Sequence, residues 1–188
     1  MKILVVDNGG QWTHREWRML RYLNIETEII PNTTPVEKIH ADGLILSGGA
    51  PRISTDIPKL GNTADYLEEE IPVLALCVAH QFLAIYFGGK AGPAKVPEYG
   101  KTEITITKKD DIFKDIPEKI VVWESHNDEI TLLPSCFEPL AHSEYCAFQA
   151  IKHKEKPFYG LQFHPEVEDT QFGEKMFKNF ADVVKEKI

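Results

Sequence analysis

The sequence has few cysteines and no long apolar run. Its 188 residues include only three cysteines, widely spaced and odd in number. A disulfide framework needs paired cysteines, so we expect reduced thiols and a cytoplasmic protein. The apolar start at residues 3–6 is too short for the core of a signal peptide, and no later run approaches a membrane span. We therefore expect no membrane association.

Basic charge is also scarce. Lys and Arg total 21 against 29 Asp and Glu, giving a formal net charge of −8. Nucleic-acid surfaces carry excess positive charge, so this balance argues against a nucleic-acid partner. The phosphate-binding pattern G-x-x-x-x-G-K-[ST] is absent. The Ser-Gly-Gly segment at residues 47–49 lacks the Asp-Ser that would continue a nucleotide pyrophosphatase loop.

The histidines and cysteines lack metal-site spacing. Cys77 and His80 are close in sequence, but no second close pair accompanies them and the remaining histidines are scattered. Structural zinc sites normally show two such pairs, so we expect no metal site. Cys136 and Cys146 are interpreted as ordinary reduced residues.

Short buried strands alternate with helices in the first half of the chain. Strands are predicted at residues 3–6, 26–30, 44–46 and 73–76, and helices at residues 11–23, 36–39, 59–69 and 78–87. This alternation predicts a parallel sheet with helices on both faces. Because no linker divides the 188 residues, we expect one domain spanning 1–188.

The pattern changes near residue 101. Residues 102–107 alternate between apolar and polar, as a half-exposed strand does. Further strands are predicted at residues 120–123, 139–142, 147–152 and 158–163, followed by a helix at residues 170–187. The prediction is therefore an α/β fold whose mixed, mainly parallel sheet carries antiparallel additions.

One thiol lies at a strand-to-helix corner. Cys77 follows the strand at 73–76 and precedes the helix at 78–87, at the edge of the sheet where open α/β folds bind ligands. The positive end of the following helix favours a thiolate. Ala75 and Ala79 are small enough for the sharp turn. The alternative is a core cysteine, since free cysteines are commonly buried.

A histidine and a carboxylate follow the strand at 158–163. Pro165 keeps His164 extended, so His164 and Glu166 project to the same side. A carboxylate beside an imidazole stabilises its charged form, as a base that serves a thiol nucleophile requires. Gly48 and Gly49, at the end of the strand at 44–46, can bring backbone N–H groups close to a ligand oxygen.

These motifs together resemble the class I, triad-type glutamine amidotransferases over nearly the whole chain. The resemblance rests on Leu-Cys-Val-Ala-His-Gln around Cys77, the Ser-Gly-Gly loop and His-Pro-Glu, in matching order. It implies a doubly wound, flavodoxin-like fold. Two features depart from the family: Ala75 and Ala79 replace glycines, and Ala50 is inserted before Pro51. The insertion leaves Gly49 or Ala50 as the backbone donor to an oxyanion.

The segment 122–129 is similar to the S-H-x-D segment of GMP synthetase glutaminases. Segments 7–11, 31–35 and 98–100 are similar to the separate glutaminase subunit of the two-chain archaeal type. This resemblance implies that ammonia passes to a separate ATP-pyrophosphatase subunit, which uses ATP and Mg²⁺ to convert xanthosine monophosphate to GMP. This chain lacks an ATP-pyrophosphatase motif, and we expect no cofactor on it.

The resemblance also implies roles for particular residues. Cys77 attacks the carboxamide of L-glutamine, His164 transfers protons and Glu166 orients His164. Backbone N–H groups of Gly49 and Val78 form the oxyanion hole. The implied substrate contacts are Gln81, Ser125, Asn127 and Asp128. Without the resemblance, these four residues are interpreted as a solvated helix start and loop.

Two alternatives remain. The same triad could serve anthranilate, aminodeoxychorismate or imidazole-glycerol-phosphate synthesis, although the segment 125–128 weighs against this. The chain could instead be a catalytically silent regulatory subunit, which the alanines at the corner suggest. The presence of Cys77, His164 and Glu166 together weighs against a silent protein.

Overall fold

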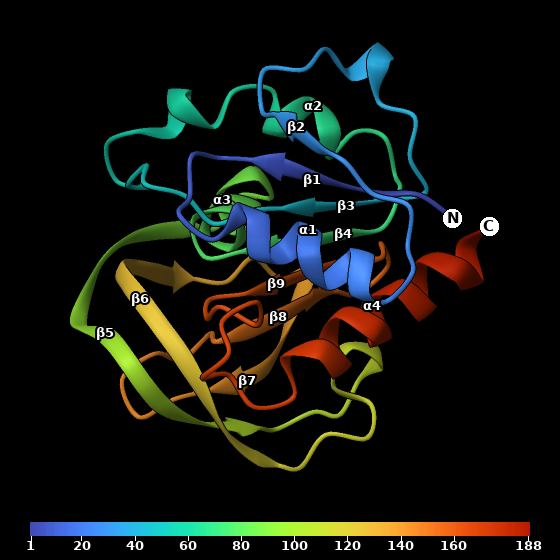
Figure 1. Ribbon diagram of the computed structural model, residues 1–188. Coiled ribbons are helices and arrows are strands. Elements are labelled where there is room, and N and C mark those ends of the chain that lie inside the picture. The colour runs from blue at the N-terminus through green and yellow to red at the C-terminus, as the bar shows by residue number, and fades with distance from the viewer.

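A nine-stranded sheet organises the computed structural model, which describes residues 1–188 (Figure 1). The strand order is β2-β1-β3-β4-β9-β8-β7-β5-β6. Its parallel half consists of β1 (Ile3–Asp7), β2 (Ile29–Pro31), β3 (Gly43–Leu46), β4 (Val73–Leu76) and β9 (Phe158–Leu161). These strands are almost wholly apolar, because helices cover both of their faces.

The other half of the sheet is antiparallel. It consists of β8 (Ala150–His153), β7 (Phe137–His142), β5 (Lys90–Ile106) and β6 (Lys119–Leu132). The long β5–β6 ribbon also contacts helix α3, beside the carboxyl end of β4. This arrangement confirms the predicted mixed sheet with a parallel core and antiparallel additions.

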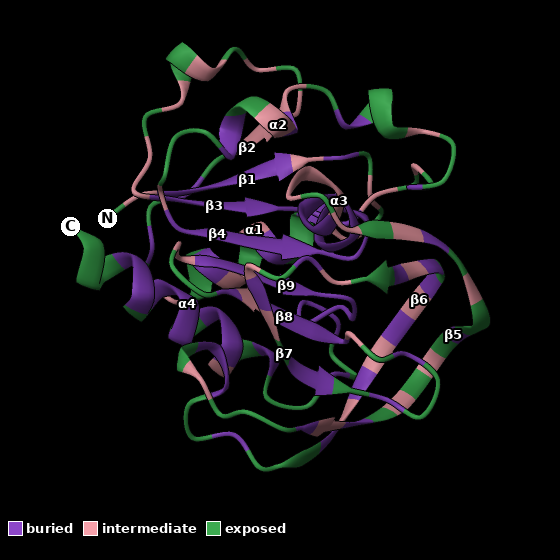
Figure 2. Ribbon diagram, turned by 180° about the vertical axis from the view of Figure 1, so that it is seen from behind, coloured by how far each residue is buried: buried purple, intermediate pink, exposed green.

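The helices divide between the two faces of the sheet. One face carries α1 (Thr13–Tyr22) and α4 (Gly173–Lys187), and the other carries α2 (Thr63–Tyr66) and α3 (Val78–Tyr86). Short 3₁₀ turns are η1 (Val36–Lys38), η2 (Ile57–Leu60) and η3 (Asp111–Phe113). Side chains of β1 alternate accordingly: Ile3 packs with the first face and Leu4 with the second. The neighbouring strands β3 and β4 are buried along their whole length (Figure 2). No helix has both the length and the apolar character needed to cross a bilayer.

Two predictions of local structure were wrong. The single helix expected at residues 59–69 is divided into η2 and α2 by Gly61. The φ of Gly61 is +57°, and the absence of a Cβ leaves room for the carbonyl of Asn32. The strands expected at 102–107 and 120–123 are parts of the much longer β5 and β6. Pro and Gly usually interrupt a strand, but in β5 a register shift between Pro93 and Glu98 keeps this irregular part within the ribbon.

Leu20 and Tyr22 provide a matched test of the packing of α1. Leu20 is fully buried against the sheet, whereas Tyr22 is 72% exposed. Leu20→Ala should lower the free energy of unfolding by about 2–5 kcal/mol, because it leaves a cavity in the core. Tyr22→Ala should change that free energy by no more than about 0.5 kcal/mol. Urea unfolding measures both, and equal losses would contradict this packing.

Candidate active site

The backbone of Cys77 forms the sharp corner between β4 and α3. Its φ and ψ are +50° and −109°, a conformation that non-glycine residues rarely adopt. The N–H of Cys77 donates to the carbonyl of Leu161 at 2.8 Å, which fixes the corner to β9. The side chain is 7% exposed and lines a pocket. The predicted position of the thiol is therefore confirmed.

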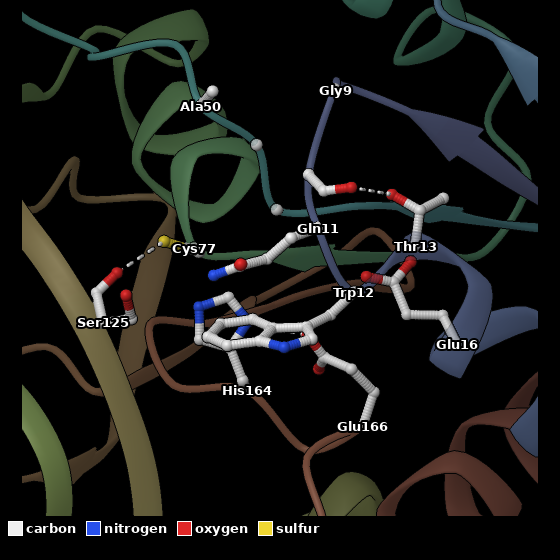
Figure 3. Close-up of a pocket in the computed structure, with 13 residues that line it drawn as sticks. Gly9, Gln11, Trp12, Thr13, Glu16, Ala50, Cys77, Ser125, His164 and Glu166 are labelled. Atoms are coloured by element: carbon white, nitrogen blue, oxygen red, sulfur yellow. Dashed lines mark hydrogen bonds and ion pairs between the residues drawn. The ribbon is translucent and has the colours of Figure 1, made fainter.

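His164 and Glu166 form a buried pair beside this thiol. His164 Nδ1 lies 2.7 Å from Glu166 Oε1, and Figure 3 shows the imidazole between Cys77 and Glu166. The ring Nε2 is buried without a hydrogen-bond partner. Trp12 packs edge-on against the ring, with centroids 4.6 Å apart. The imidazole is thus fixed by Glu166 and Trp12, while its other nitrogen stays free.

Opposing effects set the charge of His164. Burial alone lowers the pKa of the imidazole, but the Glu166 carboxylate and Cys77 outweigh burial and hold this pKa well above its usual range. The structure therefore favours imidazolium next to the thiol.

Two adjoining pockets share Cys77. The larger has a volume of about 350 Å³ and extends from the thiol and His164 toward Trp12 and Glu16. The smaller has a volume of about 90 Å³. The smaller pocket contains all the residues expected as oxyanion donors and substrate contacts: Gly49, Val78, Gln81, Ser125, Asn127 and Asp128. The structure therefore brings every predicted site residue to the same thiol.

Three of the expected contacts lie on a strand. Ser125, Asn127 and Asp128 belong to β6, so the expectation of a solvated loop there was wrong. The carbonyl of Ser125 accepts from Cys77 Sγ at 3.7 Å. The carboxylate of Asp128 lies 2.7 Å from Arg52 Nη2 and also accepts from the Ser54 hydroxyl. Asp128 consequently anchors the loop over the smaller pocket.

The amide of Gln81 is held by the same strand. Its Nε2 donates to the Asp128 carbonyl at 2.7 Å and to Gln162 Oε1 at 3.0 Å. Gln81 is an α3 residue, so these bonds fix the helix that follows Cys77 to both β6 and the end of β9. Its carbonyl oxygen is left for another donor.

Gly49 allows two loops to touch beside the thiol. A Cβ at Gly49 would lie 2.2 Å from the carbonyl oxygen of Asn8. Asn8 in turn donates to the Ser47 carbonyl at 2.9 Å, which fixes the glycine loop to the carboxyl end of β1. Gly49 and Ala50 both line the two pockets, so both residues named as alternative oxyanion donors lie near the sulfur.

Glu16 and Gln162 were missed in the sequence. Glu16 is 1% exposed, and burial followed by repulsion from Glu166 raises its pKa well above the usual range. Its spacing of four from Leu20 placed it on the inward face of α1. Gln162 is fully buried and donates to Cys77 Sγ at 3.7 Å. The sequence signal for Gln162 was its position two residues before His164, because residues two apart in an extended segment project to the same side.

His80 does not accompany Cys77 as a metal ligand. Its side chain is buried, and Nε2 donates to the carbonyl of Phe148 at 2.9 Å. Burial lowers the pKa of His80 to about 3, so the imidazole is neutral. Cys77 and His80 are the close pair noted in the sequence, and of these two residues His80 has a packing role.

A cysteine at a strained strand-to-helix corner, with a buried imidazole and carboxylate beside it, defines a nucleophile site of the triad type. The family model described as "Glutamine amidotransferase class-I" matches residues 4–184, and the chain belongs to this family.

Relatives match nearly the full chain. A glutamine-hydrolyzing GMP synthase subunit of Thermoplasma volcanium is 52% identical over 185 residues, covering 97% of this chain and 92% of the relative. Its counterpart in Thermococcus kodakarensis is 48% identical over 188 residues, covering 96% and 97%. The crystal structure of a candidate GMP synthase subunit from Thermoplasma acidophilum matches with a TM-score of 0.95 and 48% identity, covering 99% and 94%.

Glu166→Gln should lower the pKa of His164, because it removes the negative charge that stabilises imidazolium. The measurement is an NMR titration of the His164 ring against pH. Glu168→Gln is the matched control, since the side chain of Glu168 is 94% exposed. The same His164 pKa in both variants would show that Glu166 does not set the charge of the imidazole.

Proposed function

We propose that this chain is the glutamine-hydrolysing subunit of a two-subunit GMP synthase. The observation that carries the proposal is the convergence of Cys77, His164 and Glu166 on one pocket. Relatives named as one subunit of glutamine-hydrolyzing GMP synthase, 44–52% identical over nearly the whole chain, support the choice of acceptor. The proposed substrate is L-glutamine, and the proposed location is the cytoplasm.

The first half of the reaction is acylation. The Cys77 thiolate attacks the carboxamide carbon of glutamine, and the negative charge that develops on oxygen is held by the backbone N–H groups of Gly49 and Val78. Val78 is the first residue of α3, so its N–H has no acceptor within the helix. His164 as imidazolium protonates the departing nitrogen, and ammonia leaves a γ-glutamyl thioester on Cys77.

The second half is hydrolysis of the thioester. His164, now neutral, takes a proton from water, whose oxygen attacks the thioester carbonyl at the same oxyanion site. The C–S bond breaks, glutamate leaves, and the thiolate and imidazolium are restored. Glu166 stabilises the imidazolium through its 2.7 Å contact with Nδ1. The raised pKa of His164 supports this role in proton transfer.

Substrate binding is assigned to the smaller pocket. Both hydrogens of Gln81 Nε2 are engaged, so Gln81 accepts through Oε1 from the α-ammonium of glutamine. The strand residues Ser125 and Asn127 contribute beside it, and Asp128 acts through its backbone because Arg52 occupies its carboxylate.

Ammonia released into water near neutrality is mostly protonated and is then a poor nucleophile. We therefore propose that a separate ATP-pyrophosphatase subunit receives it and uses ATP and Mg²⁺ to convert xanthosine monophosphate to GMP. The relatives are named as one subunit of their enzyme, which supports a separate partner. We assign no cofactor to this chain itself.

The test is glutamate release from L-glutamine, with and without ATP, Mg²⁺, xanthosine monophosphate and the synthetase subunit. Cys77→Ala should reduce turnover by roughly 10⁴-fold or more, since removing a nucleophile abolishes the covalent route. Cys136→Ala is the control, because Cys136 lies outside both pockets and should leave turnover unchanged. The complete mixture should also produce GMP.

Each contrary result has a separate meaning. Cys77-dependent hydrolysis without GMP formation would keep the glutaminase but exclude this acceptor. Folded protein that hydrolyses no glutamine, alone or in the mixture, would overturn the catalytic proposal and favour a silent regulatory subunit.

A further inference from the structure

A second cluster of titratable side chains lies beside the smaller pocket, which one of its members, His126, also lines. Glu98 comes from β5, Glu124 and His126 come from β6, and Cys146 lies between β7 and β8. None of the four is more than 5% exposed. Donor atoms of Glu98, His126 and Cys146 all lie within 4.8 Å of one another. Groups distant in the sequence thus converge in the protein interior.

The buried face of β6 changes from apolar to polar at this cluster. Buried and less buried residues alternate along β6 (Figure 2). Ile120 and Val122 are buried, and the next buried residues on the same face are Glu124 and His126. His126 Nε2 lies 2.9 Å from Glu98 Oε2 and 3.5 Å from Glu124 Oε2. Two carboxylates therefore face one imidazole nitrogen.

Glu124 has no hydrogen-bond partner at either oxygen, although its side chain is fully buried. Burying a carboxylate without a partner is unfavourable, so this group requires a proton or a cation. Burial and the charge of Glu98 raise the pKa of Glu124 well above its usual range. One of the two unpaired oxygens, Oε2, lies 3.5 Å from His126 Nε2, so a cation bound to that nitrogen would be close to this carboxylate.

His126 has the orientation usual for a metal ligand. Its Nδ1 lies 2.9 Å from the carbonyl oxygen of Asp128. A carbonyl oxygen can only accept a hydrogen bond, so Nδ1 carries the proton and is the donor. The other nitrogen, Nε2, faces the carboxylates. Metal-binding histidines commonly donate their second N–H to a carbonyl in this way. Ser143 and Gln149 similarly donate to Glu98, at 2.6 and 2.8 Å, and orient that carboxylate.

We propose that Glu98, Glu124, His126 Nε2 and Cys146 Sγ form a site for a zinc-type divalent cation. Sulfur, imidazole and carboxylate donors together are typical of zinc and of cobalt substituted for it. Binding displaces the proton of the Cys146 thiol, the proton that buried Glu124 carries without a cation, and the proton between Glu98 and His126. The sequence expectation of no metal site considered only close pairs, whereas these ligands come from three separate segments.

A route to the site is present. Glu98 and Ser143 also line a surface groove with a volume of about 560 Å³. Tyr99 and Tyr145 border the same groove. A cation therefore reaches the cluster by displacing side chains at the base of the groove, without opening the sheet.

The cation would stabilise the strand beside the thiol. The Asp128 carbonyl that accepts from His126 also accepts from Gln81 Nε2, at 2.7 Å. A metal at His126 thus fixes the part of β6 that holds α3 and lines the smaller pocket. Its role is to position β6, not to take part in glutamine chemistry.

The test uses Co²⁺ as a spectroscopic probe, in the Cys77→Ala background so that the pocket thiol cannot bind it. We expect one equivalent to bind with a thiolate-to-cobalt charge-transfer band. Cys146→Ser should abolish that band, and Glu124→Gln should weaken binding by about 10-fold to 100-fold or more. Cys136→Ser and the exposed Glu118→Gln are matched controls that should bind as the parent does.

Zn²⁺ should also raise the Tm of the parent and the controls, with a much smaller rise in Glu124→Gln. Because Gln preserves the shape of Glu124, this variant decides the matter if Cys146→Ser fails to fold. Absence of saturable binding by the folded parent would overturn the proposal. So would an unchanged charge-transfer band in Cys146→Ser, or an equal Tm rise in Glu124→Gln; the cluster would then be held by protons alone.

Discussion

The parallel pairing of β4 with β9 is the constraint on which the site depends. Leu76 is in register with Leu161, so Cys77 and Gln162 leave the sheet side by side although they are far apart in the sequence. The hydrogen bond from Cys77 N–H to the Leu161 carbonyl continues this register into the corner. His164 follows two residues later on the same side. A slip of one residue would turn the imidazole away from the thiol.

The edge strand β6 forms one wall of the site. β6 is the last strand in the sheet order, yet the carbonyl of Trp123 accepts from the His164 N–H at 3.0 Å. Trp123 N–H donates to the Thr170 hydroxyl, and Val121 bonds the backbone and side chain of Gln171. An exposed edge strand would leave these groups unpaired. Here the segment that carries the imidazole covers the edge and draws β6 against Cys77.

The sequence predicted what depends on neighbouring residues. Pro165 and the spacing of His164 and Glu166 placed imidazole beside carboxylate, and the apolar run before Cys77 located the corner. The length of β5 and β6 escaped prediction. The prolines and glycines of β5 are typical of turns, and the polar residues 124–129 of β6 are typical of a loop, but cross-strand pairing makes both segments strands. Glu16 and Glu124 were missed for a related reason: an acidic residue indicates a solvated surface until the fold buries it. The missing information was long-range contact.

The alanines that replace the expected glycines at the corner leave its geometry intact. Positive φ is found at Cys77 but not at Ala75 or Ala79, so neither alanine adopts a backbone conformation that requires glycine. Both are fully buried in an ordinary strand and an ordinary helix. Small size is therefore the requirement at these positions, and a single methyl group meets it. The strain of the turn is confined to the residue that carries the sulfur, so the substitution gives no reason to regard the thiol as inactive.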